Sequence, residues 1–257
     1  MLHIEPVKAF RDNYLWTFHQ SGSTQAVVVD PGDAAPVQRY LQQHGLQLAG
    51  ILITHHHADH VGGASELQNA WQVPVYGPDS ARIPQVTAPV GEGDTVEVLG
   101  ITLHVLAVPG HTLDHIAYFA ANVDGAPLVF CGDTLFAAGC GRMFEGTPPV
   151  MHASLQKLAS LPMATRVFCT HEYTLSNLAF AKVVLGNVVA ERIGNEQRKR
   201  DADRPTLPST MALELATNPF LRCDDPAVLA ALASQQQFTG REPAQVFGAL
   251  RRWKDSF

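Results

Sequence analysis

Metal-binding side chains are concentrated in one short segment of the chain, which reads ILITHHHADH and ends at position 60. An apolar run of strand length leads straight into it, and in an extended chain residues i and i+2 point to the same side. His55 and His57 can therefore bind one metal ion while His56 points elsewhere. Asp59 and His60 follow the strand, where the chain should turn into a helix beginning near residue 62, so they can reach a second metal ion.

Three further candidates each follow a later apolar run. They are His111 in VPGHTLDH, Asp133 in CGDTLF and His171 in CTHEYT. Four expected strands thus present histidine or aspartate at their C-terminal ends, and functional side chains concentrate in loops at one edge of such a scaffold. This repeated placement is more specific than any single histidine, and it predicts one site built from all four segments.

Imidazole and carboxylate groups are good ligands for zinc, iron and manganese. Two metal ions about 3.5–4 Å apart need about three ligands each and an anionic bridge. The candidate residues supply that number. We assign Asp133 to the bridge and three ligands to each ion: His55, His57 and His111 to one, and Asp59, His60 and His171 to the other.

Other residues with possible chemistry lack such a pattern. His115 and Asp114 could orient metal ligands, or they could belong to the core or the surface. The cysteines show no CxxC spacing, so a cysteine-based zinc site is not expected. Cys131 and Cys169 end apolar runs and are expected to be small buried hydrophobes, and for Cys140 in GCGR we favour a structural role over a nucleophilic one. The remaining histidines are expected to be ordinary structural or surface residues: His3, His19, His44, His104 and His152.

Composition and charge exclude several classes of protein. Apolar residues make up 46% of the 257-residue chain and charged residues 16%, which excludes a long disordered protein. The formal net charge of −6 argues against a protein that holds nucleic acid through bulk attraction to phosphate. Apolar runs fall short of the ~18 residues of a membrane helix, and the N-terminus carries charges where a signal peptide needs an apolar block. We therefore expect a cytoplasmic protein with no membrane or nucleic-acid partner, and we expect a monomer.

Strand-length runs rich in Val, Ile and Phe are interspersed with helical patterns up to about residue 170, which indicates a mixed α/β fold. Beyond that point we find no convincing strand, and the helical patterns indicate a second, mostly helical domain of roughly 85 residues. The charged stretch Glu191–Arg204 is expected to be a solvated helix face or an exposed loop. The expected strands are Ala26–Val29, Ile51–Ile53, Leu103–Val108, Ile116–Ala120, Leu128–Cys131 and Val167–Cys169. The expected helices are Ala35–His44, Ala64–Trp71, Val150–Leu161, Leu178–Val189, Met211–Ala216, Ala227–Ala233 and Ala244–Trp253.

The motif THHHADH with the later GHT, GDT and THEYT resembles the metallo-β-lactamase superfamily. Further segments look like glyoxalase II, the hydroxyacylglutathione hydrolase family: AFRDNYLW, VDPGD, GDTLF, GCGRMFEG, NPFLR and the closing RRWKDSF. The resemblance covers essentially the whole chain. It implies an α+β fold, with an αββα sandwich followed by a mostly helical C-terminal domain. It also implies a catalytic domain over residues 1–170 and a substrate-binding domain over residues 171–257.

The resemblance further implies an activity, the hydrolysis of S-D-lactoylglutathione and other 2-hydroxyacylglutathiones to the 2-hydroxy acid, such as D-lactate, and glutathione. This is the second step of methylglyoxal detoxification. It implies two divalent metal ions per chain, zinc first with iron or manganese tolerated, and attack of a bridging metal hydroxide on the thioester carbonyl. By motif match the metal ligands fall on the residues chosen above, with Asp59 and Asp133 as the catalytic pair. The glutathione contacts fall on Arg142, Tyr173, Arg251 and Lys254, while Phe144 stands where some relatives carry tyrosine and cannot donate a hydroxyl hydrogen bond.

Four alternatives remain from the sequence. A single-iron persulfide dioxygenase would use two histidines and one aspartate, whereas Asp59, His60 and His171 provide for a second metal ion. The net charge disfavours a nucleic-acid hydrolase. The glutathione-type C-terminal segments disfavour another acyl hydrolase, such as a lactonase or a β-lactamase. A non-catalytic metal-binding protein would hold the metals without turnover.

Overall fold

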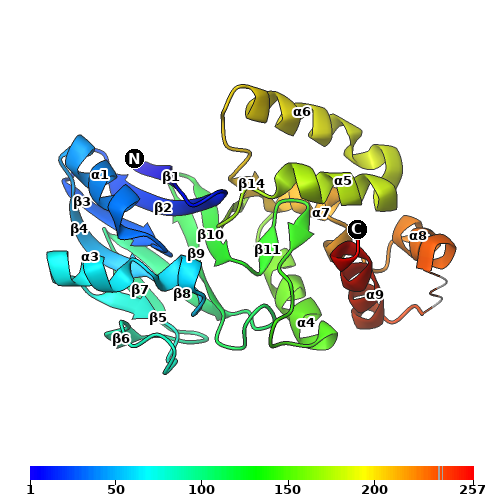
Figure 1. Cartoon of the computed structure of the whole chain (residues 1–257), viewed down its shortest axis with the longest axis horizontal. Helices are drawn as coiled ribbons and strands as arrows, with labels where there is room; N and C mark the ends of the chain where they lie inside the picture. The colour runs from blue at the N-terminus through cyan, green and yellow to red at the C-terminus, as the bar shows by residue number, and fades with distance from the viewer. Residues whose placement is uncertain (237, 239) are drawn as a thin grey trace. The chain divides into compact units, whose positions relative to one another are not determined.

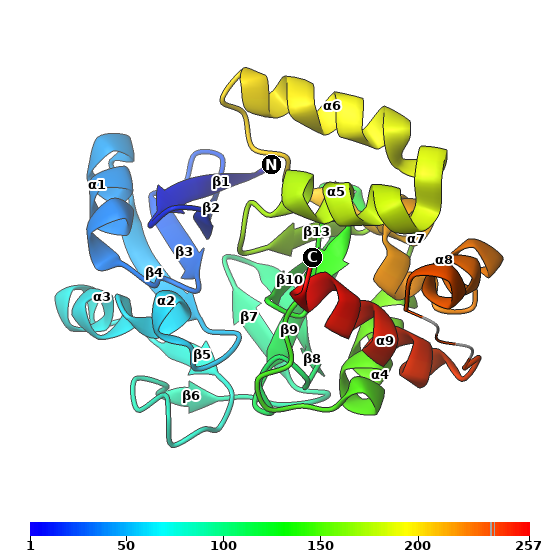
Figure 2. The same cartoon turned by 45° about the vertical axis from the view of Figure 1, so that its right-hand side comes forward.

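The computed structural model describes residues 1–236, 238 and 240–257. The chain divides into two compact units. Unit 1 comprises Met1–Ala107 and Asp114–Gly132, and unit 2 comprises Val108–Leu113 and Asp133–Phe257. Figures 1 and 2 show the elements of both units. In the described ranges, the helices lack the combination of length and apolar character that crossing a membrane requires.

Unit 1 contains a six-stranded sheet. Its strands, in spatial order, are β1 (Leu2–Ala9), β2 (Asn13–Gln20), β3 (Gln25–Val29), β4 (Gln47–Leu52), β5 (Val75–Gly77) and β6 (Ala88–Pro89). β1, β2 and β3 pair in antiparallel orientation, whereas β3 to β6 pair in parallel. Parallel neighbours need a long crossover, and the crossovers around β4 contain α1 (Ala34–His44), α2 (Ala58–Val61) and α3 (Ala64–Trp71).

A second sheet packs on the first, and its strands from unit 1 pair in antiparallel orientation. Its unit 1 strands run in the order β10 (Ala126–Gly132), β9 (Ile116–Val123), β8 (Ile101–Ala107) and β7 (Thr95–Val98). Phe18 of β2 stacks on Phe130 of β10, with ring centroids 5.5 Å apart. Tyr118 of β9 donates a hydrogen bond to the backbone carbonyl of Ile53, just after β4. The two sheets of this unit therefore share one core.

Helices α1 and α3 cover the other face of the first sheet (Figures 1 and 2). α1 begins after Asp33, whose carboxylate accepts the N–H of Ala35, and ends at Gly45 in the left-handed conformation. Its residues Val37 and Leu41, four positions apart, are fully buried against the sheet. With both faces covered, β3 is buried along nearly its whole length, which explains its continuous apolar run.

Unit 2 combines short strands with most of the helices. Its strands are β11 (Leu135–Phe136), β12 (Gly139–Cys140), β13 (Arg166–Cys169) and β14 (Ser209–Thr210). Its helices are α4 (Pro148–Ala159), α5 (Thr174–Leu185), η1 (Gly186–Val189), α6 (Ala190–Asp201), α7 (Met211–Thr217), η2 (Pro219–Leu221), α8 (Pro226–Gln236) and α9 (Pro243–Asp255). β11 pairs with β12 and β13 with β14, both in antiparallel orientation. Aromatic rings form the core: Phe220 lies 5.9 Å from Phe180 and from Phe247, and Trp253 lies 5.3 Å from Phe180.

Each strand and helix expected from the sequence has a counterpart in the structure, and two features beyond residue 170 differ from expectation. A short strand, β14, does follow Thr170, and it pairs with β13. The charged stretch Glu191–Arg204 forms α6 and is not uniformly solvated, because Arg192 and Glu196 are buried. Arg192 turns inward because it forms an ion pair of 2.5 Å with Glu214, which is also fully buried.

Candidate metal centre

Unit 1 carries the first group of candidate ligands, on the segment after β4. His57 is the N-cap of α2, with extended backbone (φ −63°, ψ 145°). Asp59 and His60 therefore lie inside a one-turn helix, whereas the sequence pattern predicted that they precede a helix beginning near residue 62. The ring of His55 lies 4.7 Å from that of His57 and 4.0 Å from that of His60, measured between centroids.

Asp30 orients two of these histidines, and sequence reasoning missed it. Its carboxylate accepts hydrogen bonds from the backbone N–H and the hydroxyl of Thr54, both at 2.7 Å, and from Nδ1 of His60 at 3.0 Å. Because the Thr54 hydroxyl donates to Asp30, it accepts from Nδ1 of His55, 3.0 Å away. Both rings thus carry hydrogen on Nδ1, which leaves Nε2 as the metal-binding atom. The signal in the sequence was the one that revealed Asp133, an aspartate directly after a buried strand.

Asp59 is partly exposed, with 42% of its side chain accessible. Its Oδ2 accepts a hydrogen bond from Nδ2 of Asn13 at 3.1 Å and lies 3.6 Å from Nε2 of His60. His60 already carries its ring hydrogen on Nδ1, so its Nε2 and the carboxylate face each other as two acceptors. A cation held by both groups removes that repulsion, which fits a metal ion bound by Asp59 and His60.

His56 and His115 have other partners. Nδ1 of His56 lies 2.9 Å from the carboxylate of Asp114, and its Nε2 lies 3.0 Å from a guanidinium nitrogen of Arg82. His115 is buried and stacks on His55 at 4.5 Å with an interplanar angle of 16°. It therefore supports the ring of His55 from one side.

Unit 2 carries the second group of candidate ligands, His111, Asp133 and His171, all buried. Oδ2 of Asp133 lies 3.5 Å from Nε2 of His111 and 3.3 Å from Nε2 of His171. Nδ1 of His111 donates to the backbone carbonyl of Arg142 at 2.8 Å, so its Nε2 and the Asp133 carboxylate again face each other as acceptors. One carboxylate oxygen placed near two imidazole nitrogens is the arrangement expected of a bridging ligand.

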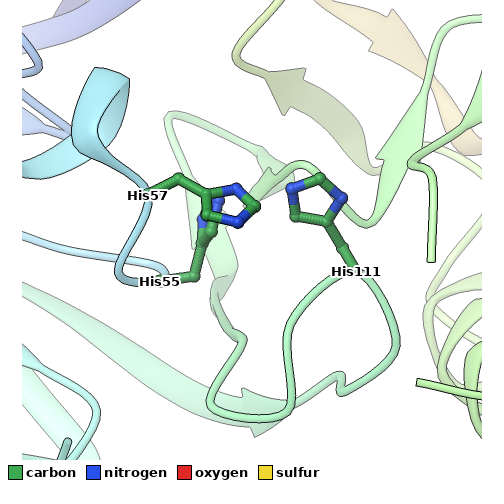
Figure 3. Close-up of side chains that lie close together, drawn as sticks. All are labelled: His55, His57 and His111. Carbon is green, nitrogen blue, oxygen red and sulfur yellow. The ribbon is translucent and has the colours of Figure 1, made fainter. Parts of the chain in front are cut away.

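The donor chemistry of both groups fits divalent metal ions. Figure 3 shows the imidazoles of His55 and His57, which come from the segment after β4, and of His111, which comes from the segment 108–113. Neutral imidazole and carboxylate are the ligands that zinc, iron and manganese share. In each unit an imidazole Nε2 faces a carboxylate, so the residues fit two divalent metal ions.

Three of the expected glutathione contacts form one basic cluster, centred on a carboxylate that sequence reasoning missed. Asp255 accepts a hydrogen bond from Arg251 at 2.9 Å, and its Oδ1 lies 3.6 Å from Nε of Arg142. Partial burial lowers the pKa of Lys254, and the neighbouring guanidinium groups of Arg251 and Arg142 lower it further. Because like charges approach this closely, the cluster is suited to an anionic ligand.

Arg251 does not lie on a solvated helix face. Its side chain is buried, lies over the ring of Phe220, and donates to the backbone carbonyl of Cys140 at 3.0 Å. The fourth expected contact, Tyr173, is 37% exposed and stacks on His171 at 4.7 Å, with an interplanar angle of 3°.

Two residues singled out in the sequence have clear surroundings. Phe144 is 64% exposed, and its ring meets that of His111 edge-on at 5.3 Å. Burial raises the pKa of the Cys140 thiol to about 11. Since the thiolate is the reactive form, this supports a structural role for Cys140.

Comparison with known proteins covers both parts of the chain. Residues 13–171 match the metallo-beta-lactamase superfamily, and residues 172–257 match the hydroxyacylglutathione hydrolase C-terminus. The chain is 52% identical over 260 residues to the hydroxyacylglutathione hydrolase of Ectopseudomonas mendocina (strain ymp), and the match covers 100% of both chains.

Solved structures support the same fold. The crystal structure of ETHE1 from Myxococcus xanthus is 23% identical with a TM-score of 0.66, and the match covers 100% of this chain and 99% of that chain. TTHA1623, solved in a di-iron-bound form, is 29% identical with a TM-score of 0.59, over 84% of this chain and 100% of that chain. The expected α+β fold, a metallo-β-lactamase sandwich followed by a helical region, is confirmed. The chain belongs to the hydroxyacylglutathione hydrolase family of the metallo-β-lactamase superfamily.

Proposed function

We propose that this protein hydrolyses S-D-lactoylglutathione, and other 2-hydroxyacylglutathiones, to the 2-hydroxy acid and glutathione. The observation that carries the proposal is the 52% identity, over the entire chain, to a protein named hydroxyacylglutathione hydrolase. The candidate metal ligands and the basic cluster of the chain provide the two things such a reaction needs, an activated water and a site for an anionic thiol. The reaction removes the product of an upstream step that joins methylglyoxal to glutathione.

We assign the metal ligands as the sequence suggested. One ion would be held by His55, His57 and His111, the other by Asp59, His60 and His171, and Asp133 would bridge them. The donor set suits zinc best among the candidates, with iron or manganese as alternatives. The relative solved in a di-iron-bound form supports a site of two metals. We also propose that the protein is a cytoplasmic monomer, with residues 1–170 carrying the chemistry and residues 171–257 the substrate contacts.

Two bound divalent ions would supply a water that is ionised near neutral pH, together with stabilisation of the charge that develops on the thioester carbonyl oxygen. Asp30 and the Arg142 carbonyl keep Nδ1 of His60 and His111 protonated, so that both rings offer Nε2. The leaving thiolate has a parent pKa of about 8.5, so it departs without a dedicated general acid. A buried thiol nucleophile such as Cys140 is not required.

The basic cluster would hold glutathione through its carboxylates. Arg142 is exposed, with 67% of its side chain accessible, and can swing to an incoming carboxylate. Lys254 gains a counter-charge in the same step, which would raise its lowered pKa again. Tyr173, stacked on His171, would contact the substrate close to the metal ligands.

The first experiment follows thioester loss from S-D-lactoylglutathione by ultraviolet absorbance, beside a metal analysis of the same sample. We expect rapid loss and about two metal ions per chain. About one iron per chain with oxygen uptake on glutathione persulfide would favour the dioxygenase. No thioester loss despite two bound metals would refute the substrate, and lactones and phosphodiesters would then be tested.

A further inference from the structure

Side chains of two helices hold the turn between β11 and β12 by its backbone. Asn218, which follows α7, donates from Nδ2 to the carbonyls of Phe136 at 3.2 Å and Gly139 at 2.9 Å. Asn177 of α5 donates to the carbonyl of Ala137 at 3.1 Å. A Cβ at Gly139 would come within 2.5 Å of the Asn177 amide, so the turn lies directly against this side chain.

The remaining turn residue is held by a buried carboxylate. Oε2 of Glu214 in α7 accepts a hydrogen bond from the backbone N–H of Ala138 at 2.7 Å. Ala138 has a φ of 55°, a conformation that a residue with a Cβ rarely adopts. The other carboxylate oxygen of Glu214, Oε1, accepts hydrogen bonds from Arg192 at 2.5 Å and from the hydroxyl of Ser209. Arg192 thus neutralises a carboxylate that would otherwise be costly to bury.

Both ends of this hairpin lead into the candidate metal centre of unit 2. Asp133 lies two residues before β11, and Gly141 directly follows β12. A Cβ at Gly141 would lie 2.0 Å from the carbonyl oxygen of Asp133 and 3.1 Å from Nδ1 of His111. The next residue, Arg142, accepts the ring hydrogen of His111 through its carbonyl at 2.8 Å. A shift of the hairpin would therefore move both the Asp133 segment and the carbonyl that orients His111.

We infer that Asn177, Glu214 and Asn218, which we call the hairpin clamp, are positioning residues for the metal centre. They fix the hairpin whose ends place the Asp133 carboxylate and the ring of His111. The helical part of the chain thus contributes to metal binding as well as to substrate binding. The inference rests on the metal ligands assigned under the proposed function.

Two double variants test the contact between Glu214 and the turn. Arg192→Met with Glu214→Gln and Arg192→Met with Glu214→Leu both remove the buried charges, but only glutamine keeps an oxygen that can accept the Ala138 N–H. Zinc affinity is measured on metal-stripped protein by competition with a chromophoric chelator. Loss of outer partners typically weakens metal binding about 10–100-fold. We expect a loss of that size for the leucine variant and an affinity close to wild type for the glutamine variant.

The spectrum of the cobalt-substituted protein gives a second readout, because it reports ligand geometry and not stability. We expect an altered spectrum for the leucine variant only. Leu232→Ala serves as the control, since Leu232 is fully buried in α8 and its truncation destabilises unit 2 without touching the turn. Its Tm should fall while its zinc affinity stays near wild type. Should the leucine variant fail to fold, Asn177→Ala removes a single turn contact, and we expect it to weaken zinc binding by several-fold.

Equal zinc affinity and equal cobalt spectra in the glutamine and leucine variants would overturn the inference. A loss of zinc affinity in Leu232→Ala as large as that in the leucine variant would also overturn the inference, because destabilisation alone would then explain the result. These readouts do not depend on turnover. A wild-type protein that binds two metals but leaves the thioester intact would refute the proposed substrate and leave the clamp testable.

Discussion

Three imidazoles of the candidate centre are each held by a partner on Nδ1. His60 donates to the Asp30 carboxylate, His111 to a backbone carbonyl, and His55 to the hydroxyl of Thr54. Chemically different acceptors thus achieve the same result, a ring with hydrogen on Nδ1 and a lone pair on Nε2. The Asp30 carboxylate accepts directly from His60 and is linked to His55 through the Thr54 hydroxyl, so a change at Asp30 would affect both rings.

Asp133 is the residue whose loss should be most damaging. Asp133→Ala removes the carboxylate oxygen that lies near the Nε2 atoms of both His111 and His171. We expect loss of bound metal and loss of thioester hydrolysis by at least about 10³-fold, because a missing bridge affects both ions. Metal analysis and steady-state kinetics check this. Asp203→Ala, at an exposed position, is the matched control, and near-normal activity of Asp133→Ala with two bound metals would contradict the bridge assignment.

The stability of the protein should depend on the Cys140 thiol in alkaline solution. Burial raises the pKa of this thiol from 9.0 to about 11. Between these values the unfolded chain releases a proton that the folded chain keeps, so the free energy of unfolding falls as pH rises. The loss is on the order of 2 kcal/mol at pH 11. Urea unfolding at several pH values measures it, and Cys140→Ala should show a shallower decline.

A second buried thiol, that of Cys223, also affects how the free energy of unfolding changes with pH. Burial raises the pKa of Cys223 to about 12, so it contributes to the same decline. We therefore expect the shallowest slope for the variant that lacks both thiols. A Cys140→Ala slope identical to wild type would show that the Cys140 thiol ionises equally in both states.

Individual ligands could be found in the sequence because they follow recognisable strands. His111, Asp133 and His171 each come directly or almost directly after an apolar run. Asp30 has the same placement after a buried strand as Asp133, and its role became clear from its contacts with Thr54 and His60. Contacts between distant segments, such as that of Asn13 with Asp59, depend on the tertiary fold and leave no local pattern.

At the scale of elements, strand interiors were easier to predict than strand edges. Strands β3 and β10 are buried along most of their length and have continuous apolar sequences, which the pattern of apolar residues reveals. The hairpin of β1 and β2 was not predicted, because Glu5, Pro6 and Lys8 interrupt the apolar pattern of β1. Two-residue strands such as β14 have no period to detect, since their pairing depends on a partner elsewhere in the chain.

The start of α3 should tolerate no side chain at Gly63. A Cβ there would lie 2.4 Å from the backbone nitrogen of Ala34 and 2.7 Å from the carbonyl oxygen of Pro31. Gly63→Ala must push apart α3 and the segment that follows Asp30. We expect a loss of roughly 1–3 kcal/mol in the free energy of unfolding, and weaker metal binding because Asp30 orients His60. Chemical denaturation and chelator competition measure the two effects.

Gly91→Ala is the matched control for this variant. Open space surrounds the position where its Cβ would lie, so the substitution meets no atom within 4 Å. We expect wild-type stability and metal affinity for it. Should Gly63→Ala behave in the same way, the packing of α3 against the Asp30 segment would not be a determinant of the centre.

At the scale of the whole molecule, unit 2 draws on both parts of the sequence that we had divided at residue 170. Its N-terminal part supplies Asp133 and the β11–β12 hairpin, and its C-terminal part supplies the side chains that hold this hairpin. Sequence patterns indicated where helices replace strands. They could not indicate that residues before and after residue 170 share one compact unit, because such contacts are set by chain topology.

Truncation after Glu172, which keeps the candidate ligand His171, should therefore also unfold residues that it leaves in place. The shortened chain lacks Asn177, Glu214 and Asn218, so four backbone groups of the hairpin lose their partners. A buried group left without a partner costs about 1–3 kcal/mol, which a unit stripped of its aromatic core cannot offset. We expect residues 133–170 to lose amide protection in hydrogen exchange, while the two sheets of unit 1 keep theirs. We also expect loss of metal binding by the truncated chain.

A chain that ends at Asp255 is the control for this truncation, because it lacks only the exposed Ser256 and Phe257 and keeps the hairpin clamp. It should retain protection throughout unit 2. Hydrolysis of the glutathione thioester at full rate by the chain ending at Glu172 would contradict the prediction, since it would mean that residues 133–170 fold without the helical region. It would also remove the reason for placing Arg251 and Lys254 at the substrate. The helical region is thus expected to be needed twice, for the metal ligand that precedes the hairpin and for the cations that meet glutathione.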